Sequence, residues 1–167
     1  MAVKKTTTAT KPAAKKTTTA TKPAAKKTAI AAKPATSANE ISVAGNKKIE
    51  TLRKEFNKKF PYLRLGIYYS YARDAVKKGE TITAIDGDKT LASVRRASSG
   101  GTISISGNKR IKTLEKEFDT VFGLYCQVCY TDKDGHRYYT SGSDDDKTLS
   151  AFNKECEVAR CKKGEWK

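Results

Sequence analysis

Two four-residue segments have the composition of an anion-binding turn. Gly45–Lys48 reads Gly-Asn-Lys-Lys, and Gly107–Arg110 reads Gly-Asn-Lys-Arg. We expect each to join a strand to a helix with the asparagine as N-cap, where free backbone N–H groups bind phosphate. Basic side chains in a first helical turn oppose the helix dipole, a cost that a bound anion would relieve. The candidate phosphate-binding residues are Asn46, Lys47, Lys48, Asn108, Lys109 and Arg110.

The alternative for these segments is an ordinary capped turn with solvated lysines, because the dipole penalty at an exposed site is small. Neither segment has the glycine spacing of a P-loop or of a dinucleotide-binding loop. Both interpretations stay open on the sequence alone.

Four cysteines stand in two pairs, Cys126 with Cys129 and Cys156 with Cys161. Paired thiols at short spacing are typical of zinc sites. Residues 126 and 129 lie in an expected strand, however, where positions three apart face opposite sides, and the first half of the chain has no cysteine. We therefore expect buried or free thiols, with Cys126 in the core, and predict no cofactor. Zinc binding and a disulfide remain the alternatives.

No set of residues is spaced for catalysis. His136 is the one histidine, and the sequence places no nucleophile or carboxylate to work with it. Asp144, Asp145 and Asp146 could gather around a metal ion, but we expect them to cap the following helix, as Asp88 does in the first half. The sequence therefore predicts a protein that is not an enzyme.

One run interleaves aromatic and basic residues. Tyr68-Tyr69-Ser70-Tyr71 stands among Arg64, Arg73 and Lys77. Aromatic rings beside cations stack on the bases of single-stranded nucleic acid. Strand tyrosines with one half-buried face are an equally good interpretation.

The first 38 residues are a polymer of lysine, threonine, alanine and proline. Lys4–Ala14 recurs identically as Lys15–Ala25, and a degraded third copy runs from Lys26 to Ala35. The first acidic residue of the chain is Glu40. Large apolar side chains are too few to form a core, so we expect disorder. The nine lysines of this tail, all candidate phosphate-binding residues, are Lys4, Lys5, Lys11, Lys15, Lys16, Lys22, Lys26, Lys27 and Lys33.

The whole chain is strongly basic, with 34 Lys and Arg against 18 Asp and Glu and a net charge of +16. The excess is concentrated in the tail, although the remaining residues are also net positive. Such a balance favours polyanionic partners, of which nucleic acid is the commonest. We expect no membrane partner and no secretory signal, because no long apolar stretch occurs.

The remainder of the chain is an internal duplication. Ile41–Phe56 aligns with Ile103–Phe118, and the match resumes at Asp88–Ala92 against Asp146–Ser150. Within each copy, apolar residues alternate in short strands and recur at helical spacing after the Gly-Asn turn. In the first and second copy respectively, we expect a strand at 41–43 and 103–105, a helix ending before Pro61 and Gly123, a strand at 63–69 and 124–130, a return strand at 81–85 and 137–141, and a short helix opening at Asp88 and Asp145.

These patterns predict an α+β protein. The expected organisation is a disordered basic N-terminal tail, residues 1–38, followed by two tandem β-α-β-β-α repeats, residues 39–100 and 101–167. Each repeat is of marginal size for folding alone, so we expect the two to pack together or to share a sheet.

The tail motif Lys-Lys-Thr-Thr-Thr-Ala-Thr-Lys-Pro-Ala-Ala-Lys-Lys resembles the lysine- and alanine-rich tails of linker histones and of bacterial histone-like proteins. The resemblance covers residues 1–38, and no linker-histone winged helix follows. The remaining chain, with the pattern Ile-x-Ile-x-Gly-x-Lys-x-Ile-x-Thr-Leu-x-Lys-Glu-Phe, resembles a small duplicated bacterial domain. The tail's resemblance implies binding to a chromosome.

Taken together, these features predict sequence-nonspecific nucleic-acid binding without catalysis, with DNA ahead of RNA as the partner. We expect a cytoplasmic, nucleoid-associated protein. The main alternative is a protein-interaction module, in which the folded repeats bind a protein partner through exposed strand edges and the tail is a solubilising tether. A component of a larger system, such as a toxin or a phage, is a third possibility.

Overall fold

The computed structural model describes residues 40–98 and 100–164, all of which belong to one compact unit. The predicted tail and its nine lysines lie outside the described residues. Within the described residues the fold is mixed α/β, with two small sheets and five α-helices. The strands are β1 (Ile41–Val43), β2 (Leu63–Tyr69), β3 (Ile103–Ile105), β4 (Leu124–Thr131) and β5 (Arg137–Tyr139). The helices are α1 (Ile49–Lys59), α2 (Ala72–Lys77), α3 (Leu91–Val94), α4 (Ile111–Phe122) and α5 (Leu149–Val158).

The two long helices form where the apolar spacing predicts them. In α1 the residues Ile49, Leu52 and Phe56 are fully buried on one face. Because α4 repeats that spacing, it buries the corresponding face. It ends at Gly123, whose φ of 64° is the left-handed conformation that glycine adopts without strain.

Both sheets are built from strands of both halves of the chain. β1 pairs antiparallel with β3 and places Ser42 opposite Ser104. β2 pairs antiparallel with β4 along all seven of its residues, with Gly66 opposite Gln127. β5 adds to the other edge of β4, which gives the order β2-β4-β5.

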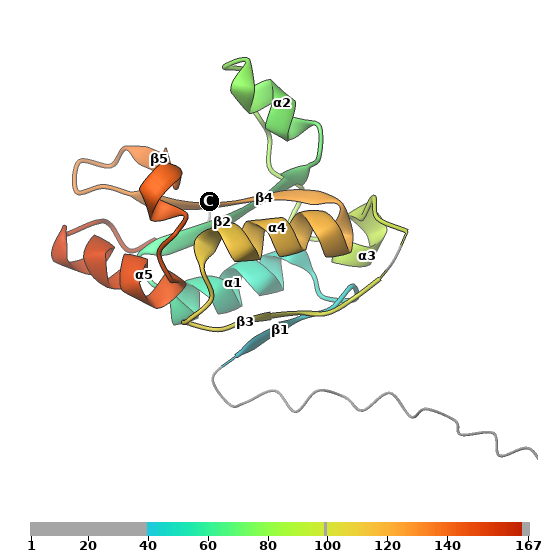
Figure 1. The fold of residues 1–167 in the computed structure, drawn as a ribbon, viewed down its shortest axis with the longest axis horizontal. Coiled ribbons are helices and arrows are strands. Elements are labelled where there is room, and N and C mark those ends of the chain that lie inside the picture. Colours follow the sequence, from blue (N-terminus) through green and yellow to red (C-terminus); the bar gives the residue numbers. More distant parts are fainter. Residues whose placement is uncertain (1–39, 99, 165–167) are drawn as a thin grey trace, which may run out of the picture. The chain divides into compact units, whose positions relative to one another are not determined.

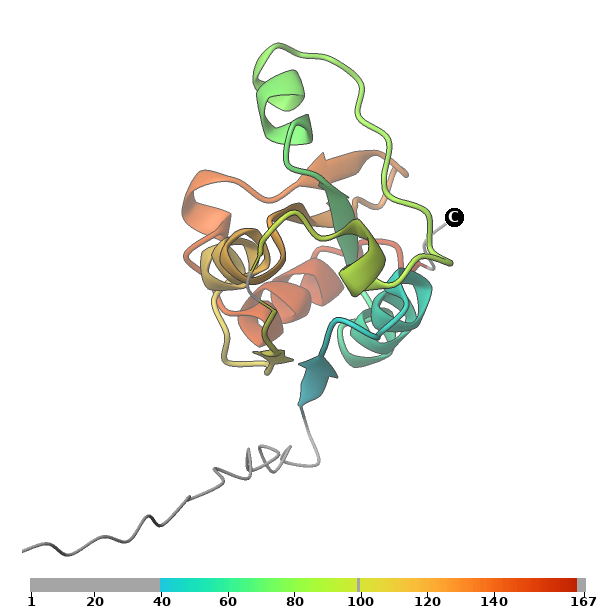
Figure 2. The same cartoon turned by 90° about the vertical axis from the view of Figure 1, so that its right-hand side faces the viewer.

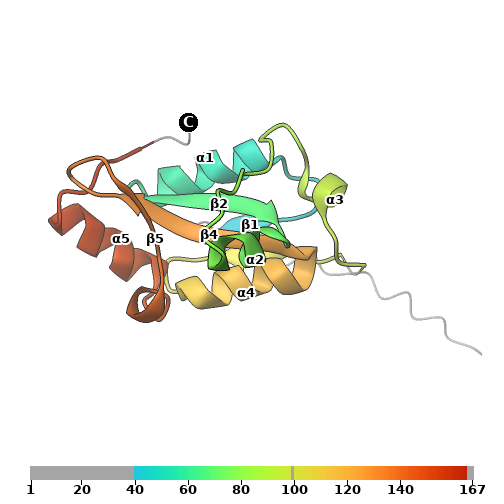
Figure 3. The ribbon, with the colours of Figure 1, turned by 90° about the horizontal axis from the view of Figure 1, so that it is seen from above.

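The elements form three layers. The β2-β4-β5 sheet lies on one side of α1 and α4, and the β1-β3 ribbon lies on the other (Figures 1 and 2). Seen from above the larger sheet, α1 and α4 flank β2 and β4 (Figure 3). Phe152 of α5 packs edge-on against Tyr130 of β4, with ring centroids 5.4 Å apart. The core therefore sits between the larger sheet and the helices.

The two halves differ where the sequence predicts a return strand in each. Residues 137–139 form β5, but residues 81–85 are not a strand, so the first half does not complete the expected β-α-β-β-α pattern. Among the described residues, one backbone hydrogen bond ties that segment to β2, from Ile85 N–H to Ile67 O at 2.9 Å. In place of a return strand the first half contains α2. This helix follows β2 and lies on the side of the sheet away from α1 and α4 (Figure 1).

The helix caps also differ from the expectation. α1 and α4 begin at Ile49 and Ile111, so Lys48 and Arg110 occupy the N-cap positions and the asparagines lie two residues earlier. The short helices α3 and α5 are capped by Thr90 and Thr148, whose hydroxyls accept from Ser93 N–H and Ala151 N–H. The aspartates at 88 and 144–146 are therefore not the N-caps of these helices. Threonine at this position satisfies an N–H group as aspartate would.

Candidate nucleic-acid interface

The first Gly-Asn turn is part of a backbone network. Ile49 N–H donates to Lys89 O at 3.0 Å, and Glu50 N–H donates to Gly87 O at 2.9 Å. Leu91 N–H in turn donates to Lys47 O at 3.1 Å. The first two N–H groups of α1 are thus occupied by carbonyl oxygens of the segment before α3.

The second Gly-Asn turn repeats this network. Ile111 N–H donates to Lys147 O at 3.1 Å, and Lys112 N–H donates to Asp145 O at 2.9 Å. The prediction of an anion site required these groups to be unbonded. In both turns they instead hold the start of a long helix to the start of the following short helix.

The basic side chains of the turns mostly face carboxylates. Lys47 forms an ion pair with Glu55, and Lys109 forms the corresponding pair with Glu117. Lys48 Nζ lies 3.7 Å from an oxygen of Asp88. These contacts relieve the dipole penalty without an external anion. Phosphate binding by Asn46, Lys47, Lys48, Asn108, Lys109 and Arg110 stays a prediction.

The four cysteines are buried free thiols. Cys126 belongs to the core cluster, as predicted, whereas Cys129 lies on the other face of β4. Burial raises the pKa of Cys126 and raises that of Cys129 to about 11. Burial and the adjacent Cys161 raise the pKa of Cys156 to about 12. Within residues 40–98 and 100–164, no three His, Cys, Asp or Glu side chains converge as a metal site would require.

The larger sheet presents a distinctive surface on the side away from α1 and α4, where α2 also lies (Figures 1 and 3). Residues whose side chains share a face are those at alternate positions and in register across the strands. We call this the outer face, and it comprises Arg64, Gly66, Tyr68, Tyr125, Gln127, Cys129, Thr131, Arg137 and Tyr139. The opposite, inner face carries Leu63, Leu65, Ile67, Leu124, Cys126 and Val128, all in the core cluster.

Tyr68 contacts two other tyrosines of the outer face, one on each of the other two strands of the sheet. The rings of Tyr68 and Tyr125 have centroids 6.1 Å apart, and the hydroxyls of Tyr68 and Tyr139 are 3.2 Å apart. Tyr68 is almost fully buried, Tyr125 is half-buried and Tyr139 is 40% exposed. Burial and the hydroxyl contact with Tyr139 raise the pKa of Tyr68, so its hydroxyl stays neutral.

Gly66 makes this arrangement possible. A Cβ atom at position 66 would lie 2.7 Å from the ring and hydroxyl of Tyr68, so the Tyr68 ring lies against the backbone there. The absent side chain lets the ring lie along β2 and reach Tyr139.

Arginines surround the three tyrosines. The Arg73 guanidinium carbon lies 5.5 Å from the Tyr125 ring centroid, and Arg73 also pairs with Asp119 at 3.1 Å. Arg64 is half-buried and Arg137 is exposed. Arg64 lies opposite Cys129 and Arg137 opposite Thr131, at the same end of β4. Burial and the positive charge of Arg137 lower the pKa of Arg64. Among the described residues no carboxylate forms an ion pair with Arg64.

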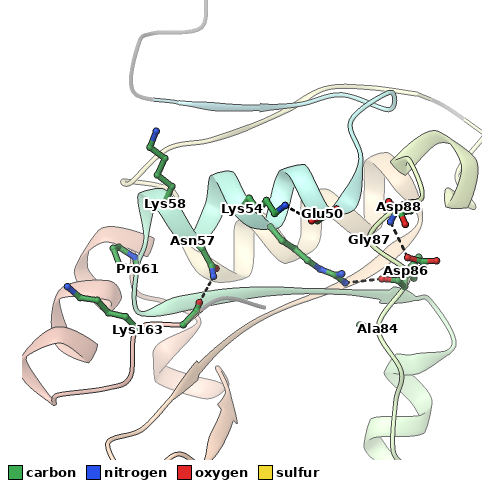
Figure 4. Close-up of a pocket in the computed structure, with 13 residues that line it drawn as sticks. Glu50, Lys54, Asn57, Lys58, Pro61, Ala84, Asp86, Gly87, Asp88 and Lys163 are labelled. Atoms are coloured by element: carbon green, nitrogen blue, oxygen red, sulfur yellow. Dashed lines mark hydrogen bonds and ion pairs between the residues drawn. The ribbon is translucent and has the colours of Figure 1, made fainter. Parts of the chain in front are cut away.

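A groove of about 910 Å³ lies beside α1, bounded by residues 84–88 and by the segment at Lys163 and Gly164 (Figure 4). Its charges are mixed, because Lys54 pairs with Glu50 at 2.5 Å within it and Asp86 and Asp88 face it. The buried Arg53 donates to Ile85 O at 3.0 Å and ties α1 to residues 84–88. With four basic and three acidic residues in its lining, this groove is close to neutral and would not select a polyanion.

The sequence identified part of the outer face. Arg64, Arg73 and Tyr68 belong to the run already singled out, but Tyr69 lies on the inner side and stacks on the exposed Tyr71 at 5.8 Å. Tyr125, Tyr139 and Arg137 were missed. The alternation of side chains in residues 124–131 and 137–139 is the sequence signal for these residues. It places them on the same face as Tyr68 only once the strand order is known.

The remaining candidates are surface groups. His136 is exposed in the hairpin turn, with Nδ1 3.6 Å from Asp132 Oδ2. Asp144 pairs with Lys147 at 3.0 Å, and Asp146 pairs with Lys112. They do not gather around a common centre.

No helix among the described residues is long and apolar enough to cross a membrane. No protein-family model, curated protein or solved structure matches this chain.

Proposed function

We propose that this protein binds nucleic acid without sequence preference and without catalysis, with DNA ahead of RNA as its partner. The observation that carries the proposal is the nine lysines of residues 1–38, with no acidic residue before Glu40. Lysines along a chain neutralise phosphates and release counterions, which supplies most of the free energy of nonspecific binding. A cytoplasmic, nucleoid-associated location follows from this proposal.

The folded residues support the proposal through the arginines of the outer face. Arg64 and Arg137 lie on either side of the same end of β4 there, and the exposed Tyr139 is on the same face. The Gly-Asn-Lys turns contribute less, because Lys47 and Lys109 already pair with Glu55 and Glu117.

The experiment is an anisotropy titration of the full chain against random duplex DNA over a series of salt concentrations. A variant with all nine tail lysines changed to glutamine keeps the chain length, and a variant with the same lysines changed to arginine keeps the charge. If most tail lysines engage phosphates, the log–log salt slope approaches about −0.9 for each phosphate contacted. The glutamine variant should lose most of its affinity and slope, and the arginine variant should keep both.

Unchanged affinity in the glutamine variant would overturn the role of the tail. The second candidate function is protein binding by strand addition, which β5 favours because it is an edge strand with all three residues exposed. The absence of duplex and single-strand binding by the full chain at low salt would turn attention to this edge.

A further inference from the structure

The outer face of the β2-β4-β5 sheet is a surface without a role in the core. The helices α1 and α4 pack on the inner face, as Figures 1 and 2 show. Tyr68 and Cys129 are buried on the outer face, yet neither belongs to the core cluster. Tyr68 contacts Tyr125 and Tyr139 on this face, so a layer of tyrosines lies over the sheet there.

The tyrosine layer is held in a defined geometry. Tyr68 lies over Gly66, and its hydroxyl contacts that of Tyr139 at 3.2 Å. Tyr125 is held from the other side by the Tyr68 ring and by Arg73. Tyr139 and Tyr125 therefore present partly exposed rings that lose little conformational freedom when a planar group stacks on them.

The cations of the face are placed for phosphate. Arg64 lies opposite Cys129 and Arg137 lies opposite Thr131, so the two arginines project from the outer face on either side of the same end of β4, where both can contact one phosphate chain. Arginine suits this role because its planar guanidinium binds two phosphate oxygens at once. The exposed ring of Tyr139 and the half-buried ring of Tyr125 lie on the same face as these cations, so the face offers both contacts of a nucleotide chain.

We infer that the outer face binds single-stranded nucleic acid, with Tyr139 and Tyr125 stacking on bases and Arg64 and Arg137 holding the phosphates between them. A single strand fits because its bases are free to splay onto aromatic rings, whereas duplex bases stack on each other. The inference rests on the proposed function for the class of ligand, but it assigns a separate site that acts without the tail lysines.

The test uses the full chain with its nine tail lysines changed to glutamine. A labelled oligothymidine of about 12 nucleotides falls within the site sizes of small single-strand-binding domains. Affinity is compared with that for a duplex of equal length at roughly 0.3 M salt, where contacts between distant exposed charges are screened. We expect this variant to bind the single strand in preference to the duplex.

Substitutions on β5 provide matched pairs. Tyr139→Leu should weaken single-strand binding by about 5- to 100-fold, as loss of one stacking ring does. Tyr139→Phe should restore most of it, because the ring remains. The control is Tyr138→Leu, since Tyr138 is the next residue of β5, is 47% exposed and faces the inner side. Thermal unfolding of all three variants checks that the fold is kept.

The arginines have a matched control in the same hairpin. Arg137→Gln and Arg64→Gln should each reduce the log–log salt slope for the single strand by about 0.7. Lys133→Gln removes the same charge at the exposed turn between β4 and β5 and should leave the slope unchanged. Photocrosslinking with 5-iododeoxyuridine in the oligonucleotide should label Tyr139 or Tyr125.

Equal effects of Tyr139→Leu and Tyr138→Leu, or crosslinks elsewhere, would overturn the site. Equal affinity of the tail-substituted chain for single strand and duplex would overturn it as well. Either result leaves the proposed function intact if the unsubstituted tail still binds duplex DNA. Conversely, the tail variant could keep full affinity for duplex DNA while the outer-face substitutions act as expected. That outcome would overturn the role of the tail and leave the outer-face site intact.

Discussion

At the scale of single residues, the two halves place a basic and an acidic side chain at the same position. Arg53 of α1 and Glu115 of α4 are corresponding residues of the duplicated segments. Arg53 donates to Ile85 O at 3.0 Å, and Glu115 Oε1 accepts from Val128 N–H at 3.1 Å. Each side chain therefore satisfies a backbone group of a neighbouring segment.

Glu115 should make stability depend on pH. Burial raises its pKa to about 8, so the folded state holds a proton that the unfolded state releases above its ordinary pKa of 4.5. Stability from Glu115 therefore falls as pH rises from about 4.5 to about 8. The free energy of unfolding, measured with urea, should fall between pH 5 and pH 8 in the parent. In Glu115→Gln this fall should be smaller by roughly 2–4 kcal/mol. Glu80→Gln, at an exposed position, is the control, and an identical pH dependence in the parent and Glu115→Gln would contradict the prediction.

Gly66 should be intolerant of a side chain. Gly66→Ala puts a Cβ atom against the Tyr68 ring and displaces it, which should cost about 1–3 kcal/mol in urea unfolding. Adding Tyr68→Leu to Gly66→Ala should recover part of the loss. The control is Gln127→Ala, at the position of β4 that pairs with Gly66, and it should have a smaller effect. A neutral Gly66→Ala would show that the ring moves aside freely.

At the scale of elements, hydrophobic periodicity predicted most helices and strands, whereas the preference of asparagine and aspartate for N-caps predicted the wrong capping residues. Alternation at Ile41 and Val43 and helical spacing from Ile49 onward match β1 and α1. The sequence predicts Asn46 as the N-cap because asparagine favours that position. In the structure, the backbone hydrogen bonds around Lys48 and Thr90 decide where α1 begins. That network joins residues 42 positions apart, so no local rule contains it.

The return strand at 81–85 failed for a related reason. Its alternating residues match a strand, but only Ile85 is buried and bonded to β2, and α2 leads the chain away from the sheet edge. In the second half, the Asp132 carboxylate accepts three backbone N–H groups of the turn and holds β5 against β4. The first half has no counterpart of this turn in its sequence.

The threonine caps should matter more than the asparagines. Thr148→Ala removes the bond to Ala151 N–H and should cost about 1 kcal/mol in chemical denaturation, as loss of an N-cap does. Asn108→Ala should cost less, since α4 begins at Ile111. The reverse order of the two losses would favour the capping role that the sequence suggested.

At the scale of the whole molecule, the described residues fold as one unit because each sheet needs both halves. β1 has its partner in β3, and β2 has its partner in β4. The outer face likewise depends on both halves, since Arg64 and Tyr68 come from β2 and Tyr125 and Tyr139 from β4 and β5. Sequence patterns within one half could therefore not reveal this face.

The halves should not fold separately. Fragments 39–100 and 101–167 each lack the partner of a central strand, so far-ultraviolet circular dichroism of either alone should show little structure. An equimolar mixture should regain the secondary structure of residues 39–167 and elute as a complex of one copy of each. A cooperative thermal transition in an isolated, monomeric fragment would contradict this.

The two strand pairs β1-β3 and β2-β4 are arranged symmetrically. Ser42 faces Ser104, and Gly66 faces Gln127, so at both places a residue meets its own counterpart in the other copy. Such self-facing is the geometry of a two-fold axis, which relates the subunits of a symmetric dimer. In evolutionary terms, the chain has the form of a fused homodimer. Because the two halves belong to one chain, neither has to match itself across this axis, and the exchange of Arg53 for Glu115 and the strand β5 in one half alone are departures from two-fold symmetry.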